Sequence, residues 1–255
     1  RGAGLCLDRG VTVTAIKSSA YKVSINGSSA DSPITESLIK RLGIKSFEID
    51  YNSPLPIGCG FGLSGASALA GAKALSNLFS LNMKEEGIGK LAHIVEVENR
   101  TGLGDVIGQV NGGFAVVEKP GAPGIGRLKP IREEVEILTI VYGGIDTRSV
   151  ISSHLKKQIN EIASPLIDDL TYDPTLENFM TVSNQFTLKS GLSTPKVRKS
   201  IERLNHVPSA MIMIGDGVFS VLRKDDPLIE ATEKLYRGIA SDLSGVYRRF
   251  KLFKW

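Results

Sequence analysis

The chain of 255 residues is 42% hydrophobic and 23% charged, a globular composition long enough for one large domain or two small ones. It has no apolar run near the roughly 20 residues that a membrane-spanning helix needs, and its two cysteines are too few for a disulfide scaffold. We therefore expect a cytoplasmic protein that does not span a membrane. The net charge of +4 suits an anionic small molecule, and no long basic run favours nucleic acid.

The first half of the chain alternates strand-length apolar segments with longer helical ones. Strands are predicted at residues 11–16, 21–25, 47–51 and 113–118. Helices are predicted at residues 32–42, 66–81 and 84–100, where apolar stripes or good helix formers recur. A loop rich in proline and glycine is expected at residues 119–127.

The second half begins a new pattern. Residues 135–142 form a continuous apolar run typical of a buried strand, and two or three helices are expected within residues 148–203. Strands are then predicted at residues 210–214 and 218–222, followed by a helix at 228–239 and a packed terminal strand at 247–255. Because strands and helices mix without regular βαβ alternation, we expect an α+β fold, divided into residues 1–132 and 133–255.

The glycine-rich stretch Pro56–Ala68 carries the strongest functional signal. Glycines at 58, 60, 62 and 65 leave a backbone that can adopt positive φ and approach a ligand closely, and a helix is predicted to follow at once. Such a loop presents unpaired N–H groups and the positive end of the helix dipole. The stretch therefore predicts a phosphate site, and with it a nucleotide ligand.

The loop is not of the Walker type, because no glycine-lysine-serine or glycine-lysine-threonine sequence follows the first glycine at the required spacing. Two other interpretations, a dinucleotide-binding loop and a purely structural turn, compete with that of a phosphate loop. Gly60, Gly62 and Gly65 form a literal G-x-G-x-x-G, which is also found in dinucleotide-binding proteins, but the βαβ repeat and the acidic strand end of such proteins are missing. A purely structural turn rarely needs so many glycines, since each adds entropy to the unfolded chain.

Carboxylates follow in the sequence Val-Glu-Val-Glu-Asn-Arg-Thr-Gly-Leu-Gly-Asp. Glu96 and Glu98 flank the apolar stripe of the predicted helix about equally, so periodicity does not choose between them. Asp105 follows a glycine turn and projects towards a cleft, or else caps a helix that starts at Val106. Carboxylate and phosphate oxygens are the ligands that Mg²⁺ prefers, so these acids complement the phosphate loop.

The loop resembles the signature P-x-G-x-G-L-G-S-S-A of the galactokinase, homoserine kinase, mevalonate kinase and phosphomevalonate kinase (GHMP) superfamily. Pro56, the first three glycines and Ser64 match, whereas Phe61, Leu63 and Gly65 depart from the pattern. The resemblance implies a two-lobed α+β fold with mixed sheets, packed helices and an active site between an ATP-binding lobe and a C-terminal lobe. It implies nucleotide binding by Pro56, Gly58, Gly60, Phe61, Gly62, Leu63, Ser64, Gly65 and Ala66.

The same resemblance assigns roles to the polar residues. Ser64 would help to hold the Mg²⁺ of ATP together with Glu96 or Glu98, with spacing from Asp105 slightly favouring Glu96. Asp105 would orient or deprotonate the acceptor hydroxyl. Residues 215–217 lie where the family has a second glycine-rich strand and turn, and they form either a ligand contact or a hairpin turn.

Within the superfamily, the chain is similar to the archaeal pantoate kinases. Residues 1–4, 56–64, 96–109 and 112–126 carry this similarity. It implies ATP-dependent phosphorylation of (R)-pantoate to 4-phosphopantoate in coenzyme A biosynthesis, with Arg1 and Arg148 as candidates to face the carboxylate of pantoate. We expect the first motif of the family to lie before Arg1, and a homodimer is left open.

Three alternatives remain at this point. The chain could phosphorylate another small acceptor such as shikimate, homoserine or mevalonate. It could also be a nucleotide-binding protein without catalysis, although retention of Ser64 and Asp105 argues against this. Dinucleotide binding through the literal glycine pattern is the third.

Overall fold

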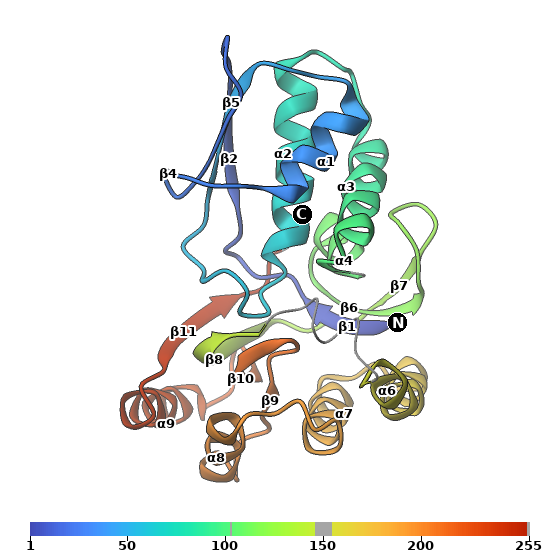
Figure 1. Ribbon diagram of the computed structural model, residues 1–255. Coiled ribbons are helices and arrows are strands. Elements are labelled where there is room, and N and C mark those ends of the chain that lie inside the picture. Colours follow the sequence, from blue (N-terminus) through green and yellow to red (C-terminus); the bar gives the residue numbers. More distant parts are fainter. Residues whose placement is uncertain (103, 146–154, 254–255) are drawn as a thin grey trace.

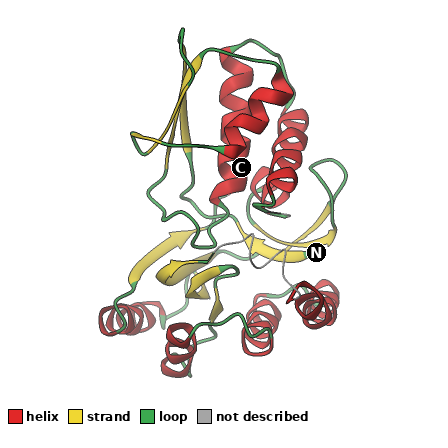
Figure 2. Ribbon diagram, viewed as in Figure 1, coloured by secondary structure: helices red, strands yellow, loops and turns green. Residues whose placement is uncertain are grey.

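The computed structural model describes residues 1–102, 104–145 and 155–253 (Figure 1). Helices and a sheet make one end of the molecule, a row of helices lies under a second sheet at the other end, and a small third sheet lies between them (Figure 2). The mixture of sheets and helices confirms the predicted α+β class. No helix in the described part of the chain is long and apolar enough to cross a membrane.

The N-terminal sheet has the order β2-β5-β3-β4, with β2 antiparallel and β3 parallel to the central β5. Its strands are β2 (Thr12–Lys17), β3 (Lys22–Ile25), β4 (Ser28–Ser29) and β5 (Phe47–Asn52). The helices beside it are α1 (Pro33–Leu42), α2 (Leu63–Leu78), α3 (Glu85–Asn99) and α4 (Asp105–Asn111). Helix α1 begins where Ser32 accepts a hydrogen bond from the Thr35 N–H and ends at Gly43, whose φ of 66° favours glycine.

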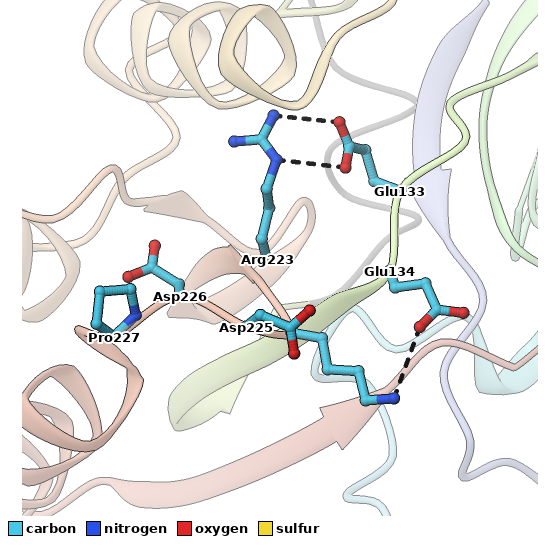
Figure 3. A pocket seen from close by; sticks show the side chains of 7 residues that line it. Glu133, Glu134, Arg223, Asp225, Asp226 and Pro227 are labelled. Carbon is cyan, nitrogen blue, oxygen red and sulfur yellow. Dashed lines mark hydrogen bonds and ion pairs between the residues drawn. The ribbon is translucent and has the colours of Figure 1, made fainter.

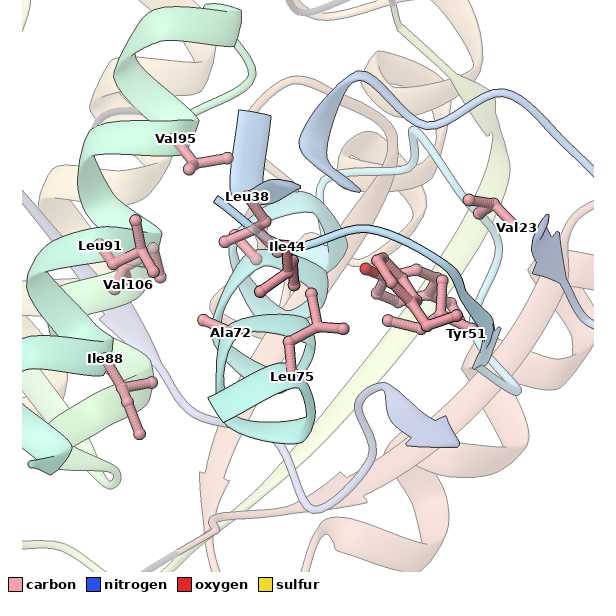
Figure 4. Close-up of a cluster of buried hydrophobic side chains, with 14 residues drawn as sticks. Val23, Leu38, Ile44, Tyr51, Ala72, Leu75, Ile88, Leu91, Val95 and Val106 are labelled. Atoms are coloured by element: carbon pink, nitrogen blue, oxygen red, sulfur yellow. The ribbon is translucent and has the colours of Figure 1, made fainter. Parts of the chain in front are cut away.

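A single apolar core joins this sheet to α1, α2 and α3 (Figure 4). Leu38 and Leu75 are fully buried in it, and the Tyr51 hydroxyl lies 2.9 Å from the Thr35 hydroxyl. A Cβ atom at Gly71 would lie 2.6 Å from that tyrosine oxygen, so a glycine is required where α2 meets β5. This packing fixes the axis of α2, and therefore the position of the glycine-rich loop that precedes it.

The middle sheet has the order β1-β6-β7 and contains two strands that the sequence did not predict. Its strands are β1 (Gly2–Leu5), β6 (Phe114–Lys119) and β7 (Arg127–Pro130). β1 and β7 are short outer strands, and their glycines, lysine and proline give no apolar alternation. Only pairing with the predicted central strand β6 identifies them.

The C-terminal sheet is antiparallel throughout, with the order β11-β8-β10-β9. Its strands are β8 (Val135–Gly144), β9 (Ala210–Met211), β10 (Gly215–Arg223) and β11 (Val246–Lys251). The helices are α6 (Leu155–Tyr172), α7 (Leu176–Lys189), α8 (Pro195–Arg203) and α9 (Ile229–Asp242). One apolar cluster contains Leu63 and Phe114 together with Phe250, so the core extends from the first half of the chain into the second. The domain division at residues 132–133 falls in the connection from β7 to β8 and stays a prediction.

The predicted hairpin turn at residues 215–217 is wrong. Gly215 and Gly217 lie in β10, while the connection to β9 is made by residues 212–214, where Ile214 has a φ of 55°. A Cβ atom at Gly217 would lie 2.6 Å from the Ile140 carbonyl oxygen, and the strand register shifts between Asp216 and Gly217. The glycines therefore serve a bulge and a close strand approach.

Candidate active site

The glycine-rich loop ends at the N-terminus of α2, where the sequence placed it. Gly58, Gly60 and Gly62 have φ values of 75°, 79° and 65°, in a region that residues with a side chain rarely adopt. Gly62 caps α2 without any side-chain hydrogen bond to the first turn. The first N–H groups of the helix are therefore directed at the space in front of the loop, which suits an anion.

The loop packs directly against the C-terminal sheet. The Ile145 N–H donates to the Gly58 carbonyl oxygen at 3.0 Å. A Cβ atom at Gly60 would lie 2.7 Å from the Met213 carbonyl oxygen, and one at Gly215 would collide with the Cys59 carbonyl. Glycine on both sides of the contact thus allows the two backbones to touch, and the sheet fixes the shape of the loop.

Not every side chain of the predicted nucleotide-binding run faces outward. The Phe61 ring lies 5.8 Å from the Phe250 ring, and Leu63 is 8% exposed in the cluster shared by both halves. These two residues replace polar or smaller residues of the family signature, and they anchor the loop in the core. Because both side chains are apolar, any hydrogen bond from these two residues to a ligand would come from the backbone.

Glu96 is a buried carboxylate beside the loop. It is 1% exposed, and its Oε1 accepts a hydrogen bond from the Thr101 hydroxyl at 2.6 Å. Its Oε2 is buried and has no hydrogen-bond partner among the described residues. Burial raises the pKa of Glu96, the Thr101 hydrogen bond lowers it, and the charge of Asp105 raises it further. An ionised Glu96 would leave a negative charge uncompensated, so the position suits a cation.

Asp105 lies beside Glu96 at the start of α4. A Cβ atom at Gly65 would lie 3.1 Å from the Asp105 Cβ atom and 3.2 Å from the Glu96 Oε2. One at Gly102 would collide with the Glu96 carboxylate and lie 2.9 Å from the Asp105 Oδ2. Although Asp105 keeps an exposed surface, loss of surrounding water raises its pKa. Two carboxylates thus meet at the first turn of α2.

Ser64 completes the group on the helix side. Its hydroxyl donates to the Thr101 carbonyl oxygen at 3.4 Å, which places it next to the turn that holds Glu96. No cluster of three His, Cys, Asp or Glu side chains occurs in the described parts of the chain. Mg²⁺ binds proteins through one or two carboxylates and takes other ligands from phosphates, so Glu96 and Ser64 fit this ion.

The structure separates Glu98 from Glu96. Glu98 accepts a hydrogen bond from the Arg41 Nε at 3.0 Å, forms an ion pair with the same guanidinium, and has a side chain that is 48% exposed. The Arg41 hydrogen bond lowers the pKa of Glu98. Only Glu96 of the two lies among the residues at the glycine loop.

The two candidate arginines for the substrate lie elsewhere or outside the description. The Arg1 Nη1 is 2.5 Å from the Asp168 Oδ1 on α6, so its charge is already paired. Arg148 lies outside the described residues.

Three further residues take part in the site without having been predicted. Thr101 holds Glu96, and the Gln109 Nε2 donates to the Gly62 carbonyl oxygen at 2.8 Å. Gln109 lies one helical turn after Asp105, so helical spacing could have identified it. Arg248 shares a face of β11 with Phe250, and its buried Nη1 has no hydrogen-bond partner among the described residues. Burial raises the pKa of Cys59 in the loop, and the positive charge of Arg248 lowers it in part.

The hollow of Figure 3 is not part of this group. It lies at the ends of β8 and β10 remote from the glycine loop, since β8 begins at Val135 and β10 ends at Arg223. Arg223 pairs with Glu133 at 3.1 Å, and Lys224 pairs with Glu134 at 3.6 Å. These charged side chains pair with one another, and neither Glu96 nor Asp105 lines the hollow.

We predict that Glu96→Gln stabilises the protein in the absence of ligands. Because the folded pKa of Glu96 is raised, the native state binds more protons, and stability falls as pH rises from the ordinary value of 4.5 through the raised one. At neutral pH the neutral amide should increase the free energy of unfolding by about 1–3 kcal/mol. Urea unfolding from pH 5 to 8 with a chelator present checks this. Identical pH slopes for wild type and variant would contradict it.

Comparison with known proteins identifies the family. The family model for the N-terminal domain of GHMP kinases matches residues 32–113, which include the loop, Glu96 and Asp105. A pantoate kinase of Methanocaldococcus jannaschii is 33% identical over 88% of this chain and 84% of its own length. A pantoate kinase of Thermococcus kodakarensis is 31% identical over 100% of this chain and 90% of its own length.

Solved structures show the same fold. One described as a phosphotransferase related to the CoA biosynthesis pathway matches with a TM-score of 0.86 and 29% identity, over 99% of this chain and 87% of its own. Homoserine kinase from Cytophaga hutchinsonii matches with a TM-score of 0.71 and 14% identity, over 99% of this chain and 89% of its own, which supports the fold alone. The chain therefore belongs to the GHMP kinase family.

Proposed function

We propose that the protein transfers the γ-phosphate of ATP to the primary hydroxyl of (R)-pantoate, forming 4-phosphopantoate. The observation that carries the phosphoryl transfer is the meeting of two carboxylates, Glu96 and Asp105, at the loop-facing end of α2. The choice of pantoate is supported by relatives of that name, including one from Methanospirillum hungatei at 27% identity over 92% of this chain. Such a reaction would serve coenzyme A biosynthesis.

Each part of the site has a task in this proposal. The backbone N–H groups of the loop and the first turn of α2 bind and orient the phosphates. Glu96 and Ser64 hold Mg²⁺, which when bound neutralises charge on the phosphate oxygens. Thr101 keeps the Glu96 carboxylate in place through its hydrogen bond of 2.6 Å. Glu98 has no part, because Arg41 already binds it.

Asp105 is the proposed partner of the acceptor hydroxyl. It accepts the hydroxyl proton as the oxygen attacks the γ-phosphorus and ADP leaves. The raised pKa of Asp105 makes it a stronger base than an ordinary aspartate, although it must be ionised to act. The proposals that Arg1 and Arg148 bind the acceptor carboxylate rest on the sequence, with Arg1 needing to leave Asp168 first.

The substrate is tested by ADP release with pantoate, shikimate, homoserine and mevalonate under the same conditions. We expect turnover with pantoate at least about 100-fold above the other three, since a site that pairs a substrate's polar groups rejects acceptors that leave them unpaired. A carboxylate-free alcohol of similar size is the control for uncoupled ATP hydrolysis. Turnover with another acceptor and none with pantoate would overturn the substrate but leave the kinase chemistry intact.

Asp105→Asn should lower kcat by about 10²- to 10⁴-fold, the usual contribution of a positioned general base. The amide retains the shape of the side chain but cannot accept the proton. In wild type, kcat should fall as pH is lowered through the raised pKa of Asp105, and the variant should lose this limb. Near-normal turnover of the variant would remove the role.

The metal assignment is tested with the two acids of α3 and with Ser64 of α2. Glu96→Gln should raise the Mg²⁺ concentration for half-maximal rate by about 10-fold or more, because a charged ligand is lost. Ser64→Ala should raise it less, and Glu98→Gln should leave it within about 2-fold of wild type, since an exposed ion pair contributes little. A Mg²⁺ titration of kcat at saturating substrates measures all three. Equal shifts for Glu96→Gln and Glu98→Gln would contradict the assignment.

A further inference from the structure

The loop between β6 and β7, residues 120–126, has no part in the site described above. It runs beside α3 and α4 (Figure 1), with Ile125 57% exposed on its outer side. The N–H groups of Ile125 and Gly126 both donate to the Ala122 carbonyl oxygen at 2.9 Å, so the loop folds on itself. Ala122 and Pro123 are buried, unlike the tip of an ordinary connecting loop.

Pro123 meets α3 at a glycine. A Cβ atom at Gly89 would lie 2.9 Å from the Pro123 Cγ atom, 3.1 Å from its Cβ atom and 3.3 Å from the Val110 Cγ2 atom of α4. Gly89 is thus the point where the loop, α3 and α4 touch one another. A glycine inside a helix costs about 1 kcal/mol relative to alanine, and this close approach explains its presence.

The same loop reaches α4 at a second point. A Cβ atom at Gly126 would lie 2.5 Å from the Ile107 Cδ1 atom, and Ile107 is 3% exposed. Ile107 follows Asp105 by two residues in α4. The loop therefore contacts both helices that carry the site: α3 with Glu96, and α4 with Asp105.

We propose that Pro123 is a positioning residue, which sets α4 against α3 and thereby holds Asp105 at its working distance from Glu96. The N-terminal end of α4 has little freedom to move, because Gly102, which lies between the two carboxylates, has no room for a side chain. A shift of α4 by part of an ångström therefore moves Asp105 relative to the bound phosphates. This inference rests on the proposed kinase function.

A pair of identical substitutions in α3 tests the proposal. Gly89→Ala pushes a methyl group against Pro123, whereas Gly87→Ala, two residues earlier and therefore on the opposite side of α3, places its methyl group no closer than 3.8 Å to Met83. Gly89→Ala should lower kcat by about 10- to 100-fold, as expected for a small misplacement of a catalytic group. The KM values for ATP and pantoate should stay within about 3-fold, because the loop and the helix N-terminus are untouched. Gly87→Ala should match wild type in all three constants.

Compensation separates positioning from a general loss of structure. Pro123→Ala alone should lower kcat about 3-fold with unchanged KM, since the contact is loosened. When Pro123→Ala is combined with Gly89→Ala, the loss of the proline ring makes room for the new methyl group. The kcat of this double variant should be at least about 5-fold higher than that of Gly89→Ala alone, a coupling typical of residues in direct contact. If Gly89→Ala fails to fold, the Pro123→Ala variant tests the proposal by itself. An unchanged kcat, with or without a raised KM, would then overturn the positioning role.

The two failures are distinguishable. A wild-type protein without turnover on pantoate or any other acceptor would refute the proposed function itself. An active wild type, together with a Gly89→Ala variant that has the kcat of Gly87→Ala, would overturn the positioning role alone. A kcat loss in Gly89→Ala that Pro123→Ala does not relieve would also overturn it.

Discussion

The structure depends on holding two carboxylates next to each other at the N-terminus of one helix. Desolvation raises the pKa of Glu96 and of Asp105, and the negative charge of Asp105 raises the pKa of Glu96 further. Such an arrangement destabilises the ligand-free protein at neutral pH, and a cation held by these acids, as in the proposed function, would relieve it. Binding of metal and nucleotide would then be linked to folding stability, because only the folded protein brings these groups together.

The second constraint is the contact between the loop and the C-terminal sheet. Gly60 and Gly215 let two backbones touch, and the Phe61 and Phe250 rings pack beside them. A phosphate-binding loop made of glycines alone would be flexible, since glycine loses much entropy on ordering. The sheet supplies the order that the glycines lack, so the C-terminal half is needed even though it contributes few polar groups to the site.

Local signals in the sequence predicted the elements whose ends are chemically marked. Helix α1 begins after Ser32 and ends at Gly43 as expected, and the glycine-rich loop enters a helix. The choice between Glu96 and Glu98 was beyond periodicity, because both flank the apolar stripe of α3. The Arg41 side chain from α1 distinguishes them by pairing with Glu98, and that contact joins residues far apart in the sequence. Strands β1 and β7 escaped prediction for the same reason, as only pairing with β6 orders them.

The departures from the family signature have a common physical basis. Phe61 and Leu63 fill the core that the loop shares with the C-terminal half. Gly65 stands where the signature has alanine, and a Cβ atom there would press on the Asp105 Cβ atom at 3.1 Å and on the Gln109 Oε1 at 3.1 Å. A side chain at this position would require these neighbours to shift, so glycine allows Asp105 and Gln109 to lie close to the first turn of α2. In a site that had lost its function, substitutions would not be expected to fit the packing of Glu96 and Asp105. These departures therefore favour an active kinase over an inactive nucleotide-binding protein.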